Sequence, residues 1–247
     1  MKLVLEKAAD FQKSIEAIAV LIDEAEFVVD EKGLSLKATD PSQISMVDFS
    51  LGKEAFKEFD VEGKMKIGLD LDYLRQVMSR AKADDQLTLE LDGQGNRLDV
   101  SFKGASSRKF NLPLIDISAA ELPNPKIEFD ANVKLVASVL QDALKDASLV
   151  SSHVSLGVSG DSFVVKAESS KGNLDSVTEK DKKNLIELTA KGDAMSMFPL
   201  DYLQDMLKAA QSIAPVELML KNSAPIQVSY AIGSASIRYF LAPRIES

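Results

Sequence analysis

Apolar residues recur at helical spacing in four segments of this 247-residue chain and alternate with polar residues through most of the remainder. The helical spacing predicts amphipathic helices over residues 8–23, 71–82, 133–147 and 200–210. The alternation predicts strands at residues 2–5, 26–30, 34–39, 44–51, 64–69, 86–92, 97–103, 107–112, 128–132, 153–159, 162–167, 173–178, 185–191, 216–222, 225–232 and 235–241. Residues 53–63 are predicted to form a charged loop. Together these elements favour an α+β fold with helices on one face of antiparallel sheets.

The chain also repeats itself. Leu-Asp-Tyr-Leu occurs at residues 71–74 and again at 200–203, and a strand-like run follows each copy at the same spacing. Further correspondences keep the same order, with offsets between 123 and 130: 98–102 with 226–230, 108–116 with 238–246, and 21–25 with 144–148. We therefore predict an internal duplication in which each domain holds two β-α-β-β-β units. The expected parts are domain 1–116, a proline-bearing connector 117–127 and domain 128–247.

Composition narrows the class of protein. Because 45% of residues are hydrophobic, two ordinary folded domains are expected instead of a disordered chain. We expect neither a signal peptide nor a membrane span, since no apolar run is long enough. The absence of cysteine excludes disulfides and thiolate chemistry. A net charge of −9 argues against coating nucleic acid with the whole surface, so any DNA role requires a local basic face.

No combination of residues predicts an enzyme, a metal site or a cofactor site. The single histidine, His153, begins a predicted strand and is interpreted as structural, and without cysteine the usual zinc and nucleophilic sets are missing. Asp84 and Asp85 are adjacent in a turn, where we expect both to be solvated and unsuited to acid–base catalysis. The glycines at 93 and 95 join two strands, which favours a hairpin turn over a phosphate-binding loop.

Five short segments match a known family in order along the whole chain. They are Leu-Ile-Asp-Glu-Ala at 21–25, Ala-Thr-Asp-Pro-Ser at 38–42, Leu-Asp-Leu-Asp-Tyr-Leu at 69–74, Pro-Leu-Ile-Asp at 113–116 and Leu-Ala-Pro-Arg-Ile-Glu at 241–246. The set resembles the proliferating cell nuclear antigen, the DNA sliding clamp of archaeal and eukaryotic replication, and its archaeal type in particular. The resemblance implies two similar domains, and three subunits that close head to tail into a ring, with helices lining the hole and sheets outside.

The resemblance also implies a subunit interface between two edge strands, 107–112 of one subunit and 173–178 of the next. Arg108 and Lys109 would then face Asp175 and Glu179. The full set of expected interface residues is Arg108, Lys109, Phe110, Asn173, Asp175, Val177 and Glu179. The alternative is that these are ordinary edge strands protected by charge.

A closed ring retains DNA by encirclement, so weak and sequence-independent phosphate contacts suffice and the acidic body is compatible with a DNA role. The expected DNA-facing cations are Lys13, Arg75, Arg80, Lys82, Lys134, Lys145 and Lys208. Each could equally be part of a solvated helix face. Gln12, Ala19, Gln76 and Ser79 stand where the family often has basic residues, which predicts weak DNA affinity.

Clamps of this family bind short partner peptides in an apolar pocket beneath the connector, and the resemblance implies the same pocket here. Its expected residues are Gln43, Ile44, Met46, Leu122, Pro123, Pro125, Pro225, Phe240, Ala242, Pro243, Arg244 and Ile245. The alternative for Ile44, Met46 and Phe240 is that they belong to the core. Asn124 replaces a usually apolar connector residue, which puts the affinity of the pocket in doubt.

The favoured function is therefore a non-enzymatic clamp that holds a DNA polymerase on duplex DNA. By resemblance, its further partners are the clamp loader, flap endonuclease and ligase, each through a short peptide, and copies of itself. One alternative is a subunit of a heterotrimeric or checkpoint-type clamp. Another is a duplicated enzyme or small-molecule-binding protein, for which the sequence offers no buried polar cluster. The expected location is cytoplasmic and nucleoid-associated in an archaeon, or nuclear in a eukaryote.

Overall fold

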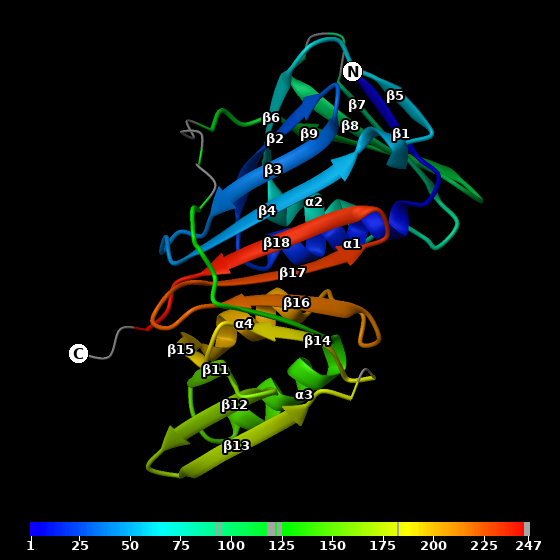
Figure 1. Cartoon of the computed structure of the whole chain (residues 1–247). Helices are drawn as coiled ribbons and strands as arrows, with labels where there is room; N and C mark the ends of the chain where they lie inside the picture. Colours follow the sequence, from blue (N-terminus) through cyan, green and yellow to red (C-terminus); the bar gives the residue numbers. More distant parts are fainter. Residues whose placement is uncertain (92, 94, 118–121, 123–124, 182, 245–247) are drawn as a thin grey trace. The chain divides into compact units, whose positions relative to one another are not determined.

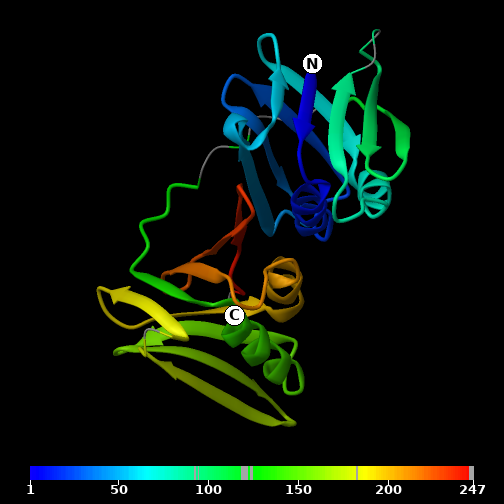
Figure 2. The ribbon, with the colours of Figure 1, turned by 90° about the vertical axis from the view of Figure 1, so that its right-hand side faces the viewer.

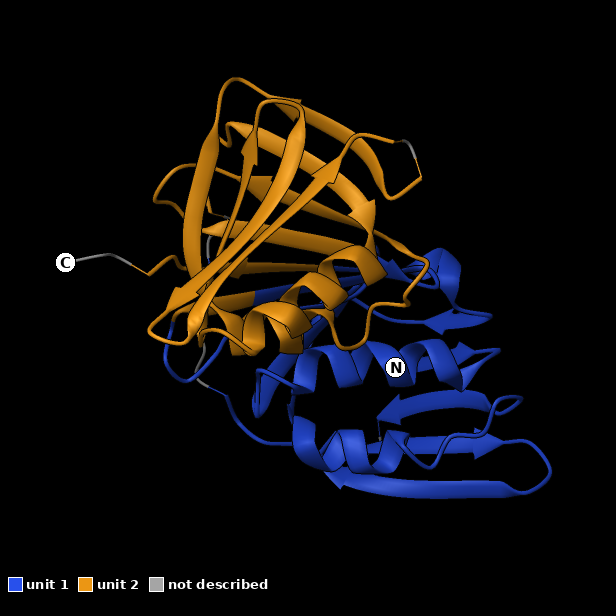
Figure 3. Ribbon diagram, turned by 90° about the horizontal axis from the view of Figure 1, so that it is seen from below, with its two compact units in different colours: residues 1–43, 47–123, 231–237 blue, residues 44–46, 124–230, 238–247 orange. Residues whose placement is uncertain are grey.

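The computed structural model describes residues 1–91, 93, 95–117, 122, 125–181 and 183–244. It contains two compact units (Figure 3). Unit 1 comprises Met1–Gln43, Val47–Pro123 and Ala231–Ile237, and unit 2 comprises Ile44–Met46, Asn124–Tyr230 and Arg238–Ser247. Each unit combines helices with antiparallel strand pairs, so the α+β prediction is confirmed.

The two halves of the chain repeat the same series of elements (Figure 1). The first half consists of β1 (Lys2–Leu5), α1 (Ala8–Ala19), β2 (Glu24–Asp30), β3 (Gly33–Thr39), β4 (Ser45–Gly52), the 3-10 helix η1 (Lys53–Ala55), β5 (Glu58–Asp60), β6 (Met65–Asp70), α2 (Leu71–Met78), β7 (Gln86–Leu91), β8 (Arg97–Lys103) and β9 (Ser107–Pro113). The second half consists of β10 (Ala131–Val136), α3 (Ala137–Ser148), β11 (His153–Ser159), β12 (Ser162–Ser169), β13 (Gly172–Glu179), β14 (Leu185–Ala190), β15 (Ala194–Pro199), α4 (Leu200–Leu207), β16 (Pro215–Leu220), β17 (Ile226–Ile232) and β18 (Ala235–Leu241).

Strand order shows the duplication more fully than sequence does. The first half has the orders β5-β1-β7-β8-β9 and β4-β3-β2-β6, and the second half has β14-β10-β16-β17-β18 and β13-β12-β11-β15. Every strand of one half thus has a counterpart at the same position in the other. Within each unit the two helices pack against each other, α1 with α2 and α3 with α4 (Figure 2).

The helices define the register of the repeat. Helices α1 and α3 have 12 residues each and α2 and α4 have 8 each, and both pairs begin 129 positions apart. The expected match of residues 21–25 with 144–148 is therefore wrong, because the first segment follows α1 whereas the second lies inside α3. A short run of similar letters was a weaker guide to register than the apolar stripe.

Burial of those stripes is the main source of stability in each helix layer. Phe11, Ile15 and Ile18 of α1 are at most 4% exposed, and Leu71 and Leu74 of α2 are at most 1% exposed. Each such side chain contributes roughly 1.5–3 kcal/mol on burial. The opposite face of each helix is thereby left to polar residues.

All four predicted helices have the wrong bounds. The helix expected from residue 133 begins at Ala137, because Ala131–Val136 alternates buried and half-buried residues and pairs as strand β10. Helices α1, α2 and α4 end three or four residues earlier than predicted. After α2 the chain continues through turns whose hydrogen bonds span three residues instead of four. Arg80 N–H donates to the Val77 carbonyl at 3.0 Å, and Ala81 N–H donates to the Met78 carbonyl at 2.9 Å.

Two strands are absent from the prediction. Strand β5 lies inside the expected loop 53–63 and pairs with β1. Strand β15 pairs with β11 and precedes α4, as β6 pairs with β2 and precedes α2. The counterpart of β6 is therefore β15, whereas the predicted strand at residues 185–191 (β14) corresponds to β5.

Gly33 lies where β3 packs closely against β4, so a substitution there tests this packing. It has φ 143°, and a side chain there would collide with the Leu51 carbonyl and lie 2.9 Å from the Lys53 nitrogen. We predict that Gly33→Ala lowers the free energy of unfolding by about 1–3 kcal/mol, measured by urea denaturation. Gly192→Ala, which meets no atom within 4 Å, is the matched control and should change it by less than about 0.5 kcal/mol. Equal effects of the two changes would contradict the packing argument.

Candidate DNA-facing surface and partner-binding site

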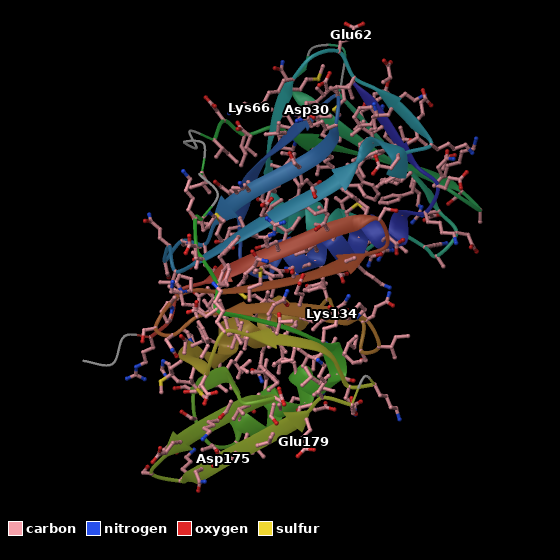
Figure 4. All side chains as sticks on the ribbon, in the orientation of Figure 1. Asp30, Glu62, Lys66, Lys134, Asp175 and Glu179 are labelled. Carbon is pink, nitrogen blue, oxygen red and sulfur yellow. The ribbon has the colours of Figure 1, made fainter. Side chains whose placement is uncertain are left out.

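The predicted DNA-facing cations occupy three kinds of position. Lys13, Arg75 and Lys145 lie on helices α1, α2 and α3, where Arg75 and Lys145 are exposed and Lys13 is half-buried. Arg80, Lys82 and Lys208 are exposed just after helix ends. Lys134 was wrongly assigned to a helix, since it lies half-buried on strand β10, between β14 and β16 (Figure 4).

The four helices carry more carboxylates than cations. Arg75 Nη2 lies 2.8 Å from Asp72 Oδ1, and Lys145 Nζ lies 3.0 Å from Asp142 Oδ1. Across the four helices there are seven acidic and three basic residues. Exposed pairs of this kind are weak and are screened by salt. The helices themselves are thus net negative, and the exposed cations Arg80, Lys82 and Lys208 lie beyond their ends.

Asp85 departs from the sequence prediction. It was expected to be solvated, but it is 2% exposed and its carboxylate contacts the Arg108 guanidinium. Asp85 also accepts the Lys82 N–H at 2.8 Å. The Lys82 N–H bond, followed by the Arg108 contact, lowers the pKa of Asp85 although burial acts in the opposite direction. The carboxylate therefore stays ionised as a structural anchor for the turn between α2 and β7.

Arg108 links this turn to the edge strand β9. Its Nη1 donates to the Arg80 carbonyl at 2.6 Å, and its guanidinium carbon lies 5.2 Å from the centre of the Phe102 ring. The ring of Phe102 in turn meets Phe110 edge-on at 6.0 Å. Phe110 is thus positioned through Arg108 and Phe102, so the edge of this sheet is ordered from within the subunit.

Strands β9 and β13 each lie at the end of a strand order, as an interface between subunits requires. Along β13 the exposed positions alternate, and Val177 is 59% exposed. Figure 4 shows Asp175 and Glu179 on this strand. The exposed residues of β13 among those predicted are Asn173, Asp175, Val177 and Glu179.

The expected interface cations Arg108 and Lys109, and the expected interface anion Asp175, already have partners inside the chain. Lys109 Nζ lies 2.7 Å from Asp99 Oδ2, and Lys166 Nζ lies 3.2 Å from Asp175 Oδ1. Arg108 is held by Asp85. Ion pairing between β9 and β13 of two subunits would therefore require these side chains to exchange partners.

The predicted partner-pocket residues fall in both compact units. Gln43 and Leu122 belong to unit 1, and Pro123 and Ile245 lie outside the described residues. In unit 2, the Ala242 N–H donates to the Ile44 carbonyl at 2.8 Å, which brings two predicted pocket segments together. Unit 2 contains the remaining predicted pocket residues, namely Ile44, Met46, Pro125, Pro225, Phe240, Ala242, Pro243 and Arg244.

Burial separates these residues into two groups. Met46 and Phe240 are each 8% exposed and thus belong largely to the core, as the alternative interpretation held. Ile44, Ala242 and Pro243 are half-buried, and Arg244 is exposed. Pro225 is also half-buried and Pro125 is exposed, so the apolar surface available to a ligand in unit 2 comes from these prolines together with Ile44 and Ala242.

The C-terminal segment and the segment that precedes the connector make the same contact in their own units. Ile115 N–H donates to the Gly68 carbonyl on β6 at 3.0 Å, and Arg244 N–H donates to the Met197 carbonyl on β15 at 2.7 Å. The two donors are 129 positions apart, as are the two acceptors, so the expected match of 108–116 with 238–246 is one residue out of register here. This relation was missed because β15 was not predicted.

Comparison with solved structures defines the class of protein. The structure of PCNA from Thermococcus kodakaraensis is similar to this chain with a TM-score of 0.94 and 28% identity, covering 98% of this chain and 99% of that one. The structure of A. fulgidus PCNA with the C-terminal region of FEN-1 bound has a TM-score of 0.90 and 27% identity, covering 100% of this chain and 99% of that one. The fold is therefore that of the sliding clamps.

Sequence comparison then gives the family. The model for "Proliferating cell nuclear antigen, N-terminal domain" matches residues 1–121, and that for "Proliferating cell nuclear antigen, C-terminal domain" matches residues 124–245. The chain belongs to the proliferating cell nuclear antigen family. Two relatives are named DNA polymerase sliding clamp: one from Thermofilum pendens, 36% identical over 248 residues with 100% of both chains covered, and one from Pyrococcus horikoshii, 34% identical with 99% and 98% covered.

The Asp85 anchor predicts a specific pH dependence. Because its pKa is lowered from 3.8, its contribution to stability is present above that value and is lost as the pH falls through the folded-state pKa. We predict that Asp85→Asn lowers the urea midpoint at pH 7, and that the difference from wild type shrinks below about pH 4. Asp84→Asn, at an exposed position, is the control and should leave the midpoint unchanged. A constant difference from pH 7 to pH 3 would show that charge is not the cause.

Proposed function

We propose that this protein is a ring-forming DNA sliding clamp that tethers a DNA polymerase for processive replication. The observation that carries the proposal is the duplicated clamp fold, with both family domains matched along the chain and four helices repeated in one register. In the proposed ring, three copies enclose duplex DNA with their helices inward. The clamp acts by binding and has no catalytic activity of its own, and the connector is residues 117–127.

The net-negative helix surface supports retention by enclosure. Direct phosphate binding relies on Lys and Arg, and its strength falls steeply with salt. Lys13, Arg80 and Lys145 provide a few cations, while the neighbouring carboxylates limit their attraction. A duplex held in this way can slide, because each phosphate contact is weak and is replaced by an equivalent one at the next step.

Partner recruitment is proposed for the half-buried apolar residues near the C-terminal segment. Ile44, Ala242 and Pro243 offer apolar surface beside backbone that is already hydrogen-bonded, which suits capture of a short extended peptide. The A. fulgidus clamp with the FEN-1 C-terminal region is a structural precedent. The partners proposed are a DNA polymerase, a clamp loader, a flap endonuclease and a ligase. With archaeal relatives, association with the nucleoid is the proposed location.

The DNA-facing assignment is tested by removing three cations together. Lys13→Ala, Arg80→Ala and Lys145→Ala in one chain should reduce processivity of the loaded clamp. The same change should flatten the salt dependence, by up to roughly 0.9 in slope for each phosphate that the variant clamp no longer neutralises. The matched control removes three exposed lysines outside the helices, Lys103, Lys171 and Lys191, and should leave both quantities unchanged. Unaltered processivity and salt dependence in the first variant would refute the assignment.

Assembly is tested by light scattering after size-exclusion chromatography at micromolar concentration. A self-closing ring should give three times the chain mass of 26.8 kDa. Val177→Asp and Phe110→Ala, on the two proposed interface strands, should shift the mass toward one chain. A monomer at all concentrations would exclude the homotrimer, and co-purification with a related chain would then favour the heterotrimeric alternative.

A further inference from the structure

A groove lies on unit 2, on the face of sheet β13-β12-β11-β15 that carries the exposed strand residues. Its volume is about 950 Å³, and it is lined by residues from all four strands, from the connection between α3 and β11, and from the C-terminal segment. Cross-strand pairing places Met197, Ser155, Lys166 and Asp175 in one row across its floor. Met195 lies two residues before Met197 on β15, so the two methionines line the same end of the groove.

The duplication indicates what this kind of groove holds. On the corresponding face of unit 1, sheet β4-β3-β2-β6 carries a groove of about 730 Å³, and its lining includes Ile117 and Leu122 from the expected connector. Asp30 and Lys66, labelled in Figure 4, belong to the sheet part of that lining. The chain approaches the unit 1 groove through the bond from Ile115 to Gly68, and the Arg244–Met197 bond is its repeat in unit 2. In unit 1, therefore, this face is contacted by two residues of the chain that follows β9.

Charge indicates the chemistry of an occupant in unit 2. Arg244 Nη1 lies 3.1 Å from His153 Nδ1, and in a neutral imidazole this nitrogen can accept a hydrogen bond from the guanidinium. Burial, followed by the charge of Arg244, lowers the pKa of His153, while Asp201 acts in the opposite direction. Within the described chain, no carboxylate forms an ion pair with Arg244, whereas Lys166 is paired with Asp175 at 3.2 Å. Among the described residues, the methionine end of the groove is thus the end whose cation has no ion-pair partner.

The part of the groove over β12 and β13 has a different charge preference. Glu168 pairs across β12 and β13 with Asn173 and lines the same groove. A carboxylate placed beside Glu168 would be repelled, since like charges at short range disfavour binding. The groove therefore distinguishes an acidic residue near Arg244 from one farther across the sheet.

We propose that this groove binds an extended acidic segment that flanks the hydrophobic motif of a partner peptide. Its first carboxylate pairs with Arg244, and its apolar side chains rest on Met195 and Met197. Arg244 belongs to the C-terminal segment beside the proposed pocket, so one peptide can occupy both. Four strands spaced about 4.8 Å apart span about 14 Å, which matches roughly four extended residues. The proposal rests on the proposed partner pocket and extends it by a specificity-determining surface.

The test uses the full-length clamp and synthetic fluorescent peptides in an anisotropy titration. One peptide carries only a glutamine-and-aromatic hydrophobic motif. The others add a flank that carries two aspartates next to the motif (proximal), two aspartates at its far end (distal) or two lysines next to the motif (proximal). The proximal aspartate peptide should bind roughly fivefold tighter than the motif alone at low salt, as expected of one partly exposed ion pair. This gain should diminish as salt rises, and the distal aspartate and lysine peptides should show no gain.

Ser155 provides a matched pair of variants outside the proposed pocket. It is half-buried on the groove floor, opposite Met197 and Lys166. Ser155→Glu should abolish the affinity gain of the proximal aspartate peptide, because the two carboxylates repel each other. Ser155→Gln introduces a side chain of nearly the same size as Glu without its charge, and it should retain the gain. The motif-only peptide should bind both variants as it binds wild type. Arg244→Gln should bring the affinities of the proximal aspartate and motif-only peptides to the same value.

The outcomes separate the two proposals. Equal affinity of the proximal aspartate and motif-only peptides for the wild-type clamp would overturn the flank groove alone. A gain that survives Ser155→Glu, or tighter binding of the lysine flank, would also overturn it. Failure of the motif-only peptide to bind the wild-type clamp would overturn the proposed partner pocket, and the flank groove with it.

Discussion

Burial of a helix stripe against a sheet is the constraint on which the rest of this structure depends. A helix with one apolar face must turn that face to the sheet, and its polar face is then left for solvent or a ligand. Here the same constraint operates in both units, with α1 and α2 packed together in one and α3 and α4 in the other. The two sheet orders repeat strand for strand, so a single solution for burying helices has been used twice.

The sequence predicted those elements whose periodicity is unambiguous. Leu71–Leu74 and its repeat begin helices at the predicted residues, because an apolar stripe follows each start directly. Val133–Val136 was misassigned, since its apolar residues fit the start of a helical stripe as well as strand alternation, and pairing with β14 and β16 favours the strand. Strand β15 was missed because Met195 and Met197, on its exposed face, interrupt the polar–apolar alternation.

The candidate sites were predictable to a different extent. Resemblance to the family indicated which sequence positions belong to the sites. Which charged residues pair with one another depends on the folded structure. Asp85 is adjacent to Asp84 in sequence, yet only Asp85 is enclosed by the turn and reaches Arg108 from a strand 23 positions away. Arg244 and His153 are 91 positions apart, and no local pattern relates them. Long-range pairs of this kind are the part of the site that a single sequence leaves undetermined.

The excess of carboxylates on the helices has a mechanical consequence in the proposed ring. An enclosed duplex would face helices that carry a net negative charge like its own, interrupted by a few cations. Repulsion from all sides would then keep the duplex near the centre of the hole. Mobile cations from solution would fill the gap and exchange as the duplex moves. Friction would then depend on the ionic composition of the solution more than on the protein, and the ring would hold its position on DNA only when a partner fixes it there.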